Sequence, residues 1–511
     1  FHFIFTHFST YQSLIASYIP IGQIDNAFET MELSRAKLLA ERLAGSKENI
    51  AIPGVSQVQQ ALGKSMAVLA YANVDRKETV QIAITSKTTN GQIIAGYPFW
   101  GSALKKHDSA VNALLGKQRG IKVINTKKEN PPIGQAQKKG DLEKLINFYR
   151  SLLTNTSPEN EQPRREIARA LYDFLIKPML PQIQGKMDLI IIPDGVLSFL
   201  PFETLIDEEE KYLIESYNIT YAQSMGVMQL IKNRKYKENR KPLLAFGGAV
   251  YDEITYDTDM IENTAQLDVL KKNITLAMAD TRVVDKAYAS LGIAQMSNLP
   301  GTLAEVKALA SIVPDTEILT GGKVSEDEVK SLSDSGKLAE YKVIHFATHG
   351  IVVPEFPELS ALVLSQFKDK SGKEDGFLRM GEIAKLKLNA DFVNLSACET
   401  GLGKIYGGEG VVGLTQSFLI AGANGLSVSL WQVDDQSTMM FMVGVYQLVN
   451  EKGMSYSQAI NKMKRAFIKG QVSMDTFQPS RGITIKPVGE AKPGNLSHPY
   501  YWGPFVYYGL N

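Results

Sequence analysis

The sequence contains one thiol and one imidazole that each follow a buried-strand pattern. Cys398 is the single cysteine among 511 residues, and it ends the segment DFVNLSAC before a glycine-rich loop. His349 ends the segment YKVIHFATH and precedes Gly350. An imidazole beside a thiol can take up its proton, and the resulting thiolate is a nucleophile for acyl transfer. If the fold brings the two residues together, this pair predicts Cys–His nucleophilic catalysis.

Each of these residues also has a structural interpretation. A lone cysteine is most often a buried and unreactive side chain. Gly350 fits a plain turn, or it lets substrate approach the backbone closely because it has no Cβ. In the catalytic interpretation, the backbone N–H groups of Gly350 and Cys398 face the carbonyl that the thiol attacks and form the oxyanion hole.

A second histidine, His345, lies four residues before His349. On a helix this spacing could bind zinc, but the surrounding valine, isoleucine and phenylalanine indicate a strand. Four positions along a strand span about 13 Å, which is too far for both rings to bind one ion. We therefore predict no metal site here. We expect His345 to lie in the core or to contact the active-site residues without touching substrate.

The residues after position 241 predict the elements that position this pair. Strand-like and helix-like segments alternate there, which is typical of a mainly parallel sheet covered by helices. The 49 positions from His349 to Cys398 are enough for one crossover, so both residues are expected at one edge of neighbouring parallel strands. Strands are expected at 243–246, 342–347, 392–396 and 426–430, and a loop at 470–511. Helices are expected at 303–312, 326–332, 411–420, 437–449 and 456–468.

The residues before position 241 show different patterns. Two helical stripes in 11–44, separated by Gly22, resemble the last unit of a tetratricopeptide array, although an ordinary helical hairpin fits them equally well. Further expected elements are strands at 65–72, 79–85 and 188–192, a linker at 126–166 that contains one helix at 142–153, and a helix at 167–180. We predict three parts: a helical hairpin (1–46), a β-containing half (50–240) and a carboxyl-terminal half (241–511).

Composition and charge exclude several classes of protein. The chain has 55 Lys and Arg against 54 Asp and Glu, a net charge of +1, so neither nucleic acid nor an anionic membrane is expected as an obligatory partner. No run of about 18 apolar residues could span a bilayer, and the apolar start lacks the features of a signal peptide. One cysteine excludes an internal disulfide framework, so we expect a cytoplasmic protein. Because the sequence lacks an initiator methionine, we expect a processed chain or a fragment.

The motifs around the Cys–His pair resemble a known family. VIHFATHG (343–350) and NLSACETGLG (394–403), followed by GGEGVVGLTQSFLIAGANGLSVSLWQVDD (407–435), resemble the CHAT domain, a caspase-like and separase-related group of cysteine proteases. The resemblance extends to LPGTLAEVKALA (299–310), IIPDGVLSFLPFETL (191–205) and HPYYWGPFVYYG (498–509). It covers residues 168–511 closely and the part from residue 50 less closely.

The resemblance implies roles for both residues and a fold for the chain. Cys398 is implied as the nucleophile and His349 as the general base and acid, with the oxyanion hole described above. The implied fold is α/β: a caspase-like αβα sandwich with a mainly parallel sheet, preceded by an inactive caspase-like half and a short α-helical repeat segment. Helical repeats ahead of such a domain are a family arrangement, and no cofactor is implied.

Four further residues are candidates for a substrate pocket. In separase-like enzymes an acid near this point selects a basic side chain, so the resemblance points to Asp434 and Asp435. Each could instead cap the helix that begins near residue 437. Trp431 could line the pocket, although packing is favoured for it. Glu409 could hold the loop that carries Cys398, or it could be an exposed acid at the start of a helix.

These features together predict a regulated cytoplasmic cysteine endopeptidase that cleaves one or a few protein partners. The resemblance implies that members of this kind act in bacterial defence and signalling, and that the helical N-terminal region receives a regulatory protein. The main alternative is a non-catalytic interaction scaffold that keeps the fold without turnover. A third class, a different thiol acyltransferase or amidase, is less favoured.

Overall fold

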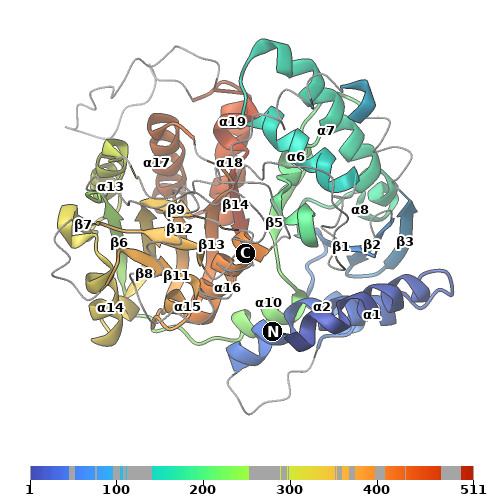
Figure 1. The fold of residues 1–511 in the computed structure, drawn as a ribbon, viewed down its shortest axis with the longest axis horizontal. Coiled ribbons are helices and arrows are strands. Elements are labelled where there is room, and N and C mark those ends of the chain that lie inside the picture. Colours follow the sequence, from blue (N-terminus) through green and yellow to red (C-terminus); the bar gives the residue numbers. More distant parts are fainter. Residues whose placement is uncertain are drawn as a thin grey trace, which may run out of the picture.

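A computed structural model of the chain shows one large and one small sheet surrounded by helices (Figure 1). It describes residues 2–44, 52–74, 78–95, 104–107, 111, 141–251, 288, 296, 298–351, 353, 359–366, 374–396, 409–431, 433–472 and 496–509. For residues 2–9, 36–44, 95, 141 and 409–412 it describes the backbone only.

The large sheet is mainly parallel and runs through both predicted halves of the chain. Its eleven strands lie in the order β3-β2-β1-β4-β5-β14-β13-β12-β8-β6-β7. Neighbouring strands are parallel except along β3-β2-β1 and between β14 and β13. In sheet order the strands are β3 (Thr89–Ala95), β2 (Glu78–Thr85), β1 (Met66–Asn73), β4 (Asp188–Ile192), β5 (Asn218–Tyr221), β14 (Phe505–Tyr508), β13 (Ala423–Ser429), β12 (Ala390–Leu395), β8 (Tyr341–Ala347), β6 (Lys241–Gly247) and β7 (Glu317–Thr320).

Helices form a layer on each side of this sheet (Figure 1). Above the strands in Figure 1 lie α6 (Asp141–Leu153), α7 (Glu161–Leu175), α8 (Leu180–Ile183), α13 (Pro300–Ile312), α17 (Asp435–Lys452) and α18 (Tyr456–Ile468). Below them lie α1 (His2–Tyr18), α2 (Ile24–Ala44), α10 (Met225–Lys232), α14 (Glu326–Asp334), α15 (Met380–Ile383) and α16 (Glu409–Ala421). Three short helices are α3 (Val55–Ala61), α9 (Leu213–Ser216) and α19 (Pro499–Trp502). None of the helices in the described ranges has both the length and the apolar character needed to cross a membrane.

The strand β4 shows why both faces of the sheet are covered. Its sequence DLIII has no polar alternation, which is typical of a strand buried on both sides. Successive side chains of a strand point to opposite faces. Leu189 and Ile191 accordingly join the hydrophobic cluster that contains α6 and α7, whereas Ile190 and Ile192 join the cluster that contains α2 and α3.

A small antiparallel sheet lies next to the end of β8. It consists of β9 (His349–Ile351), β10 (Ala361–Val363) and β11 (Phe377–Arg379), with β10 in the centre. Because β8 ends at Ala347, the chain enters this small sheet after a single residue, Thr348.

The predicted α/β fold with a mainly parallel sheet is confirmed. β4 and α18 have the bounds expected from the sequence, and the strands expected at 65–72 and 79–85 pair as β1 and β2, although residues 75–77 between them lie outside the described residues. Gly22 separates α1 from α2 with a φ of +74°, a left-handed conformation that glycine adopts without strain. The division of the chain into three parts stays a prediction.

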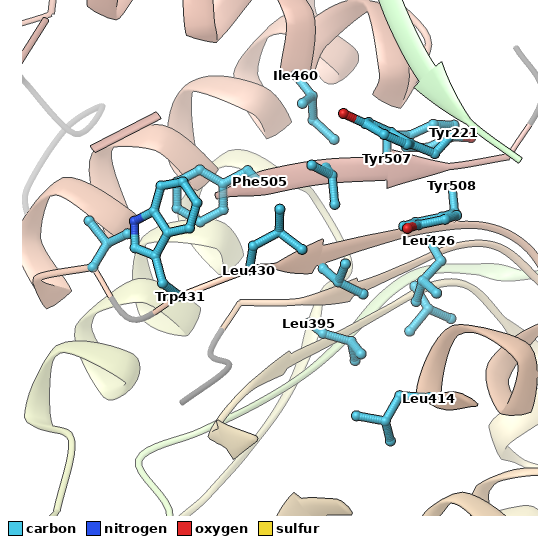
Figure 2. Packing of buried hydrophobic residues seen from close by; sticks show 14 of the residues in the cluster. Tyr221, Leu395, Leu414, Leu426, Leu430, Trp431, Ile460, Phe505, Tyr507 and Tyr508 are labelled. Carbon is cyan, nitrogen blue, oxygen red and sulfur yellow. The ribbon is translucent and has the colours of Figure 1, made fainter. Parts of the chain in front are cut away.

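Two expectations for the connecting segments were wrong. The tail was expected to be a loop, but Phe505–Tyr508 form β14, which pairs with β13 on one side and with β5 on the other. Figure 2 shows Leu426 and Leu430 beside the aromatic side chains of β14. Four residues carry too little periodicity to predict a strand, so the partner strands decide its conformation. The linker expected at 126–166 also ends early, because α7 begins at Glu161.

Candidate active site

The strands that precede the predicted imidazole and thiol are neighbours in the sheet. β8 and β12 are parallel, with Val393 opposite Ile344 and Leu395 opposite Phe346. The backbone N–H of Ser396 donates to the carbonyl oxygen of Phe346 at 2.9 Å and continues this pairing past the end of β12. Both chain segments therefore leave the sheet at its carboxyl edge, where α/β proteins gather their functional groups.

Cys398 lies outside the described residues, which stop at Ser396 and resume at Glu409. Only Ala397 separates Cys398 from Ser396 in the chain. The nucleophile and its backbone N–H group therefore stay predictions, whereas β12, the strand that leads to them, is described.

His349 lies just beyond β8, where the chain enters the small sheet. It is the first residue of β9, lies opposite Val363 of β10, and is 2% exposed. Its ring packs edge-on against the ring of Tyr251, with 4.9 Å between the centroids. The backbone N–H of His349 donates to the Tyr251 hydroxyl at 3.3 Å, and this hydroxyl donates to the carbonyl oxygen of Val363 at 3.0 Å. Tyr251 therefore fixes the backbone of His349 and packs against its imidazole.

A buried glutamate on α13 contacts both strands. Glu305 is 2% exposed, and its Oε1 accepts a hydrogen bond from the Ser396 hydroxyl at 2.7 Å. The same oxygen lies 2.9 Å from Nε2 of His345, although this ring nitrogen is not aligned for a hydrogen bond. One carboxylate oxygen thus contacts β8 at His345 and the end of β12 at Ser396.

The structure places His345 in the core. Its Nδ1 lies 3.1 Å from the Tyr446 hydroxyl and 3.1 Å from the side-chain amide of Asn394. When the amide donates to Nδ1, the ring hydrogen is on Nε2, the nitrogen that faces Glu305. Burial raises the pKa of Tyr446 well above its ordinary value, and the nearby Tyr456 and Glu305 add to this effect. The phenol therefore stays protonated and fills the space beside the imidazole.

A second acidic side chain, Asp435, lies at the start of α17. Its Oδ2 accepts the backbone N–H of Gly301 at 3.1 Å. Burial raises the pKa of Asp435 and the charges of Glu305 and Asp434 add to this, whereas the Gly301 N–H and His349 act in the opposite direction. A Cβ at Gly301 would lie 2.3 Å from Cβ of Asp435, so a glycine is required for α13 to approach α17 this closely. Glu305 and Asp435 therefore bring two carboxyl groups to the region of His349.

Comparison with known families places the chain in one of them. The family model of the CHAT domain matches residues 165–510, which is more than half of the chain. The chain belongs to the CHAT-domain family. The matched residues contain both strands of the candidate site, α13 with Glu305, and the positions of His349 and Cys398.

The CHAT domain and the segment before it are also similar to individual proteins. Human tetratricopeptide repeat protein 28 is 24% identical over an alignment of 384 residues that covers 70% of this chain and 14% of that protein. Two crystal structures of the Saccharomyces cerevisiae separase–securin complex, at 2.6 and 3.0 Å resolution, match with TM-scores of 0.45 and 0.41 and identities of 12% and 11%. These matches cover 96% and 97% of this chain and 34% of the matched chain in each case. The chain thus spans a minor part of the length of each of these proteins.

Two of the predicted pocket residues have local structural contacts in the CHAT domain. Asp434 is exposed and is the N-cap of α17, where its side chain accepts the N–H of Ser437 at 3.0 Å. Trp431 is buried just beyond β13 (Figure 2), and its indole N–H donates to the carbonyl oxygen of Tyr500 at 3.0 Å. Both the capping and the packing alternatives are thus present in the structure, and a contact of either residue with substrate stays a prediction.

The other predicted site residues are described in part. Gly350 lies opposite Leu362 in the β9–β10 pair. Because Cys398 is outside the described residues, the oxyanion hole formed with Gly350 stays a prediction. Glu409 is the first residue of α16, and its side chain also lies outside the described residues.

One group of carboxylates in the described part of the chain has the spacing of a metal site, and a lysine already occupies it. Glu326, Glu374 and Glu382 offer oxygens within 4.8 Å of one another. The Lys330 ammonium lies 2.8, 2.7 and 2.8 Å from them in the same order. This ammonium supplies the positive charge that a metal ion would bring, so the group is a charge cluster centred on lysine.

Three residues of the site region were not predicted from the sequence: Glu305, Gly301 and Tyr251. Glu305 and Gly301 lie in LPGTLAEVKALA, which served only to extend the family resemblance. A usable signal was present, because Glu305 lies on the stripe of buried residues that runs along α13. A charged residue on the apolar stripe of a helix is rarely buried without a specific partner.

Proposed function

We propose that this CHAT-domain protein is a cysteine endopeptidase in which Cys398 is the nucleophile and His349 is the general base and acid. The observation that supports this most directly is the parallel pairing of β8 with β12. In this register Phe346 lies opposite Leu395. His349 and Cys398 each follow three residues beyond that pair in their own strand direction. Because both residues lie three positions beyond the same register pair, we expect the imidazole and the thiol to lie close together at the sheet edge.

The proposed reaction has two covalent steps. The Cys398 thiolate attacks the carbonyl carbon of a peptide bond and forms a C–S bond, and the His349 imidazolium donates its proton to the departing amine as the C–N bond breaks. Water then attacks the thioester, and the neutral imidazole accepts a proton from it. The C–S bond breaks, which releases the carboxylic acid and regenerates the thiolate–imidazolium pair. The N–H groups of Gly350 and Cys398 are proposed to stabilise the oxyanion in both steps.

We propose a polypeptide substrate with a basic side chain next to the scissile bond. Asp434 supports this because it is exposed and lies five residues beyond the end of β13, the strand beside β12. Asp435 supports it because its carboxyl group interacts electrostatically with His349. Trp431 and Glu409 are proposed as further neighbours of the pocket.

We propose that a regulatory protein acts through the N-terminal helices. Leu14, Ile21 and Leu33 expose 40%, 66% and 36% of their surface on the α1–α2 hairpin, which offers apolar contact area to a partner. The buried Glu32 of α2 joins this hairpin to the CHAT domain. Its carboxylate accepts the backbone N–H groups of Met225 at 3.0 Å and Gly226 at 2.8 Å, at the start of α10.

The connection continues from α10 towards the predicted thiol loop. Gln223, two residues before α10, donates from its side-chain amide to the Thr415 hydroxyl of α16 at 2.9 Å. α16 begins at Glu409, so it is the first described element after Cys398. A movement of α2 thus has a contiguous route, through α10 and α16, to the segment that carries the nucleophile. A reduced thiol is required throughout, so we propose a reducing compartment such as the cytoplasm.

The experiment that tests this function is a cleavage survey of the proteome of the source cell. Wild-type protein and Cys398→Ala are each added, and new peptide termini are identified by mass spectrometry. We expect new termini with wild type only, clustered after basic residues. We expect His349→Ala to behave like Cys398→Ala in this survey and to keep its circular dichroism spectrum, although its unfolding midpoint should fall because the removed ring is buried against Tyr251.

Identical termini from wild type and Cys398→Ala would contradict the protease. The non-catalytic scaffold then becomes the supported function, and the partners retained by the immobilised protein would define it. Acyl transfer to an added amine, without hydrolysis of peptides, would favour a different thiol acyltransferase or amidase instead.

A further inference from the structure

We propose that Glu305 is a positioning residue of this active site: its buried carboxylate holds β8 and the end of β12 in the register that brings His349 and Cys398 together. The inference rests on the proposed function, because it assigns Glu305 a part in the reactivity of the same thiol. Glu305 does not contact substrate in this proposal. It acts through the two strands and through a neighbouring carboxyl group.

The geometry makes one carboxylate oxygen the common contact of both strands. The Ser396 hydroxyl donates to Oε1 of Glu305 at 2.7 Å, and Nε2 of His345 lies 2.9 Å from the same atom. Ser396 precedes Cys398 with one residue between them, and His345 precedes His349 by four residues. A displacement of either contact is therefore transmitted to one reacting group over at most four residues of chain.

A carboxylate at this position needs an explanation, because burying one costs free energy unless it is paired. Val306 and Leu309 of the same helix are fully buried, so an apolar side chain at position 305 would continue their stripe. Packing alone therefore does not require an acid here. A carboxylate supplies what packing cannot: an oriented acceptor for the Ser396 hydroxyl and a negative charge beside His345.

Glu305 also reaches His349 by a second route, through Asp435. Burial raises the pKa of Asp435, the charge of Glu305 adds to this, and Asp435 in turn interacts with His349. The titratable groups that face Glu305 are thus His345 on β8 and Asp435 and Tyr446 on α17. Removing the charge of Glu305 is therefore expected to change the protonation of the imidazole–thiol pair as well as its geometry.

The test is the pH dependence of alkylation of the intact protein by iodoacetamide. Because Cys398 is the single cysteine, the total label reports on one thiol. We expect a wild-type midpoint well below about 8.5, the value of a free thiol. We expect Ser396→Ala and Glu305→Gln each to slow alkylation at pH 7 about tenfold and to move the midpoint towards 8.5. Glu305→Ala should approach the reactivity of a free thiol, about thirtyfold slower than wild type.

Asn461→Ala is the matched control for the loss of a buried polar contact. Asn461 lies on α18, and its side chain bonds the backbone N–H of Ile219 at 2.8 Å and the carbonyl oxygen of Ile219 at 3.1 Å, on β5 in the other half of the sheet. This variant should unfold at lower urea concentration with an unchanged alkylation midpoint. If Glu305→Ala does not fold, Ser396→Ala still decides the question, because it removes one hydroxyl group only.

The outcomes separate this proposal from the proposed function. A midpoint that moves in Ser396→Ala and Glu305→Gln, but not in Asn461→Ala, supports the positioning role. Wild-type midpoints in both Ser396→Ala and Glu305→Gln, together with a shifted midpoint in His349→Ala, overturn the positioning role and leave the proposed function intact. A wild-type midpoint at the free-thiol value that His349→Ala does not change contradicts the proposed function, and the role of Glu305 with it.

Discussion

Each half of the large sheet has a buried glutamate, and the two glutamates have different partners. On the amino-terminal side, Glu203 accepts hydrogen bonds from the Lys464 ammonium at 2.6 Å and from the Tyr221 hydroxyl at 2.5 Å. On the carboxyl-terminal side, Glu305 accepts a hydrogen bond from Ser396 at 2.7 Å and lies beside an imidazole. Glu203 is thus paired with a full positive charge, whereas Glu305 bonds a hydroxyl group that adjoins the predicted nucleophile.

The difference separates a structural ion pair from the acid that we propose to support the active site. Glu203 and Lys464 are both 1% exposed, and burial lowers the pKa of Lys464 although Glu203 opposes this. Their pair joins α18 to the segment that precedes β5, and Tyr221 completes it. Burial of an acid therefore does not identify a site. The proposal for Glu305 rests instead on the place of its partners along the chain, because Ser396 and His345 each lie within four residues of the proposed dyad.

The largest predicted effect comes from breaking the ion pair. Glu203→Ala leaves the Lys464 ammonium buried without its carboxylate, so we expect the free energy of unfolding to fall by about 3–5 kcal/mol. Urea denaturation at pH 7 measures this change. The alkylation midpoint of Cys398 should equal that of the wild type, which would confine the effect to stability.

The control is the double variant Glu203→Leu with Lys464→Met. Replacing both partners of a buried pair by apolar side chains often restores stability. We expect this variant to unfold close to the wild-type midpoint. A shifted alkylation midpoint in Glu203→Ala would show that the two glutamates are not functionally distinct, and the comparison would fail.

A substitution at Gly301 should disturb the carboxyl-terminal side in both stability and reactivity. In Gly301→Ala the new Cβ would lie 2.3 Å from Cβ of Asp435, so α13 must move away from α17 and carry Glu305 with it. We expect a loss of about 1–3 kcal/mol in the free energy of unfolding. We also expect slower alkylation of Cys398 at pH 7.

Gly381→Ala is the matched control, because a Cβ there meets nothing within 4 Å. It lies in α15, where alanine is the better helix former, so no loss of stability is expected. Equal behaviour of the two alanine variants would argue against the close approach of α13 to α17.

Another buried glutamate, Glu326, extends the comparison to the pH dependence of stability. Burial and the nearby Glu382 raise its pKa to about 8 from an ordinary value of 4.5. The folded state thus holds this proton where the unfolded state has released it, so the free energy of unfolding should fall as pH rises from about 4.5 to 8. Glu326→Gln removes this titration. We expect its stability to rise relative to wild type by about 1–2 kcal/mol between pH 5 and pH 8, measured by urea denaturation.

The difference between variant and wild type reports on Glu326 together with the neighbours whose pKa it influences. Lys330 and Glu382 are present in both proteins, and both interact electrostatically with Glu326. A constant difference across this pH range would contradict the protonated state of Glu326.

The smallest predicted effect distinguishes Asp434 from the buried acids. Asp434→Ala removes the N-cap of α17 and should cost about 1 kcal/mol of unfolding free energy. Ser325→Ala is its matched control, because Ser325 caps α14 in the same way. If Asp434 also recognises substrate, Asp434→Ala should cleave peptides with basic residues more slowly than wild type, whereas Ser325→Ala should not. Equal cleavage by both cap variants would leave Asp434 as a helix cap only.

Much of the α/β framework could be predicted from local patterns. Apolar runs such as the one in β4 and the amphipathic stripe of α18 are long enough to be detected in one segment. The pattern of β8 and β12, with 49 positions from His349 to Cys398, also predicted two parallel strands, and the structure shows them as neighbours. By contrast, β5, β7 and β14 have four residues each, and their pairing partners make them strands.

The candidate site divides in the same way. The residue types and motifs alone predicted a thiol and an imidazole at one sheet edge and placed the chain in its family. They did not predict that Glu305 contacts both strands, that Gly301 allows α13 to meet α17, or that Tyr251 supports His349. A motif lies within one segment of the chain, so the sequence by itself is sufficient to recognise it. These contacts join residues that are 40 to 134 positions apart, so only the packed tertiary structure decides which acid lies beside which strand.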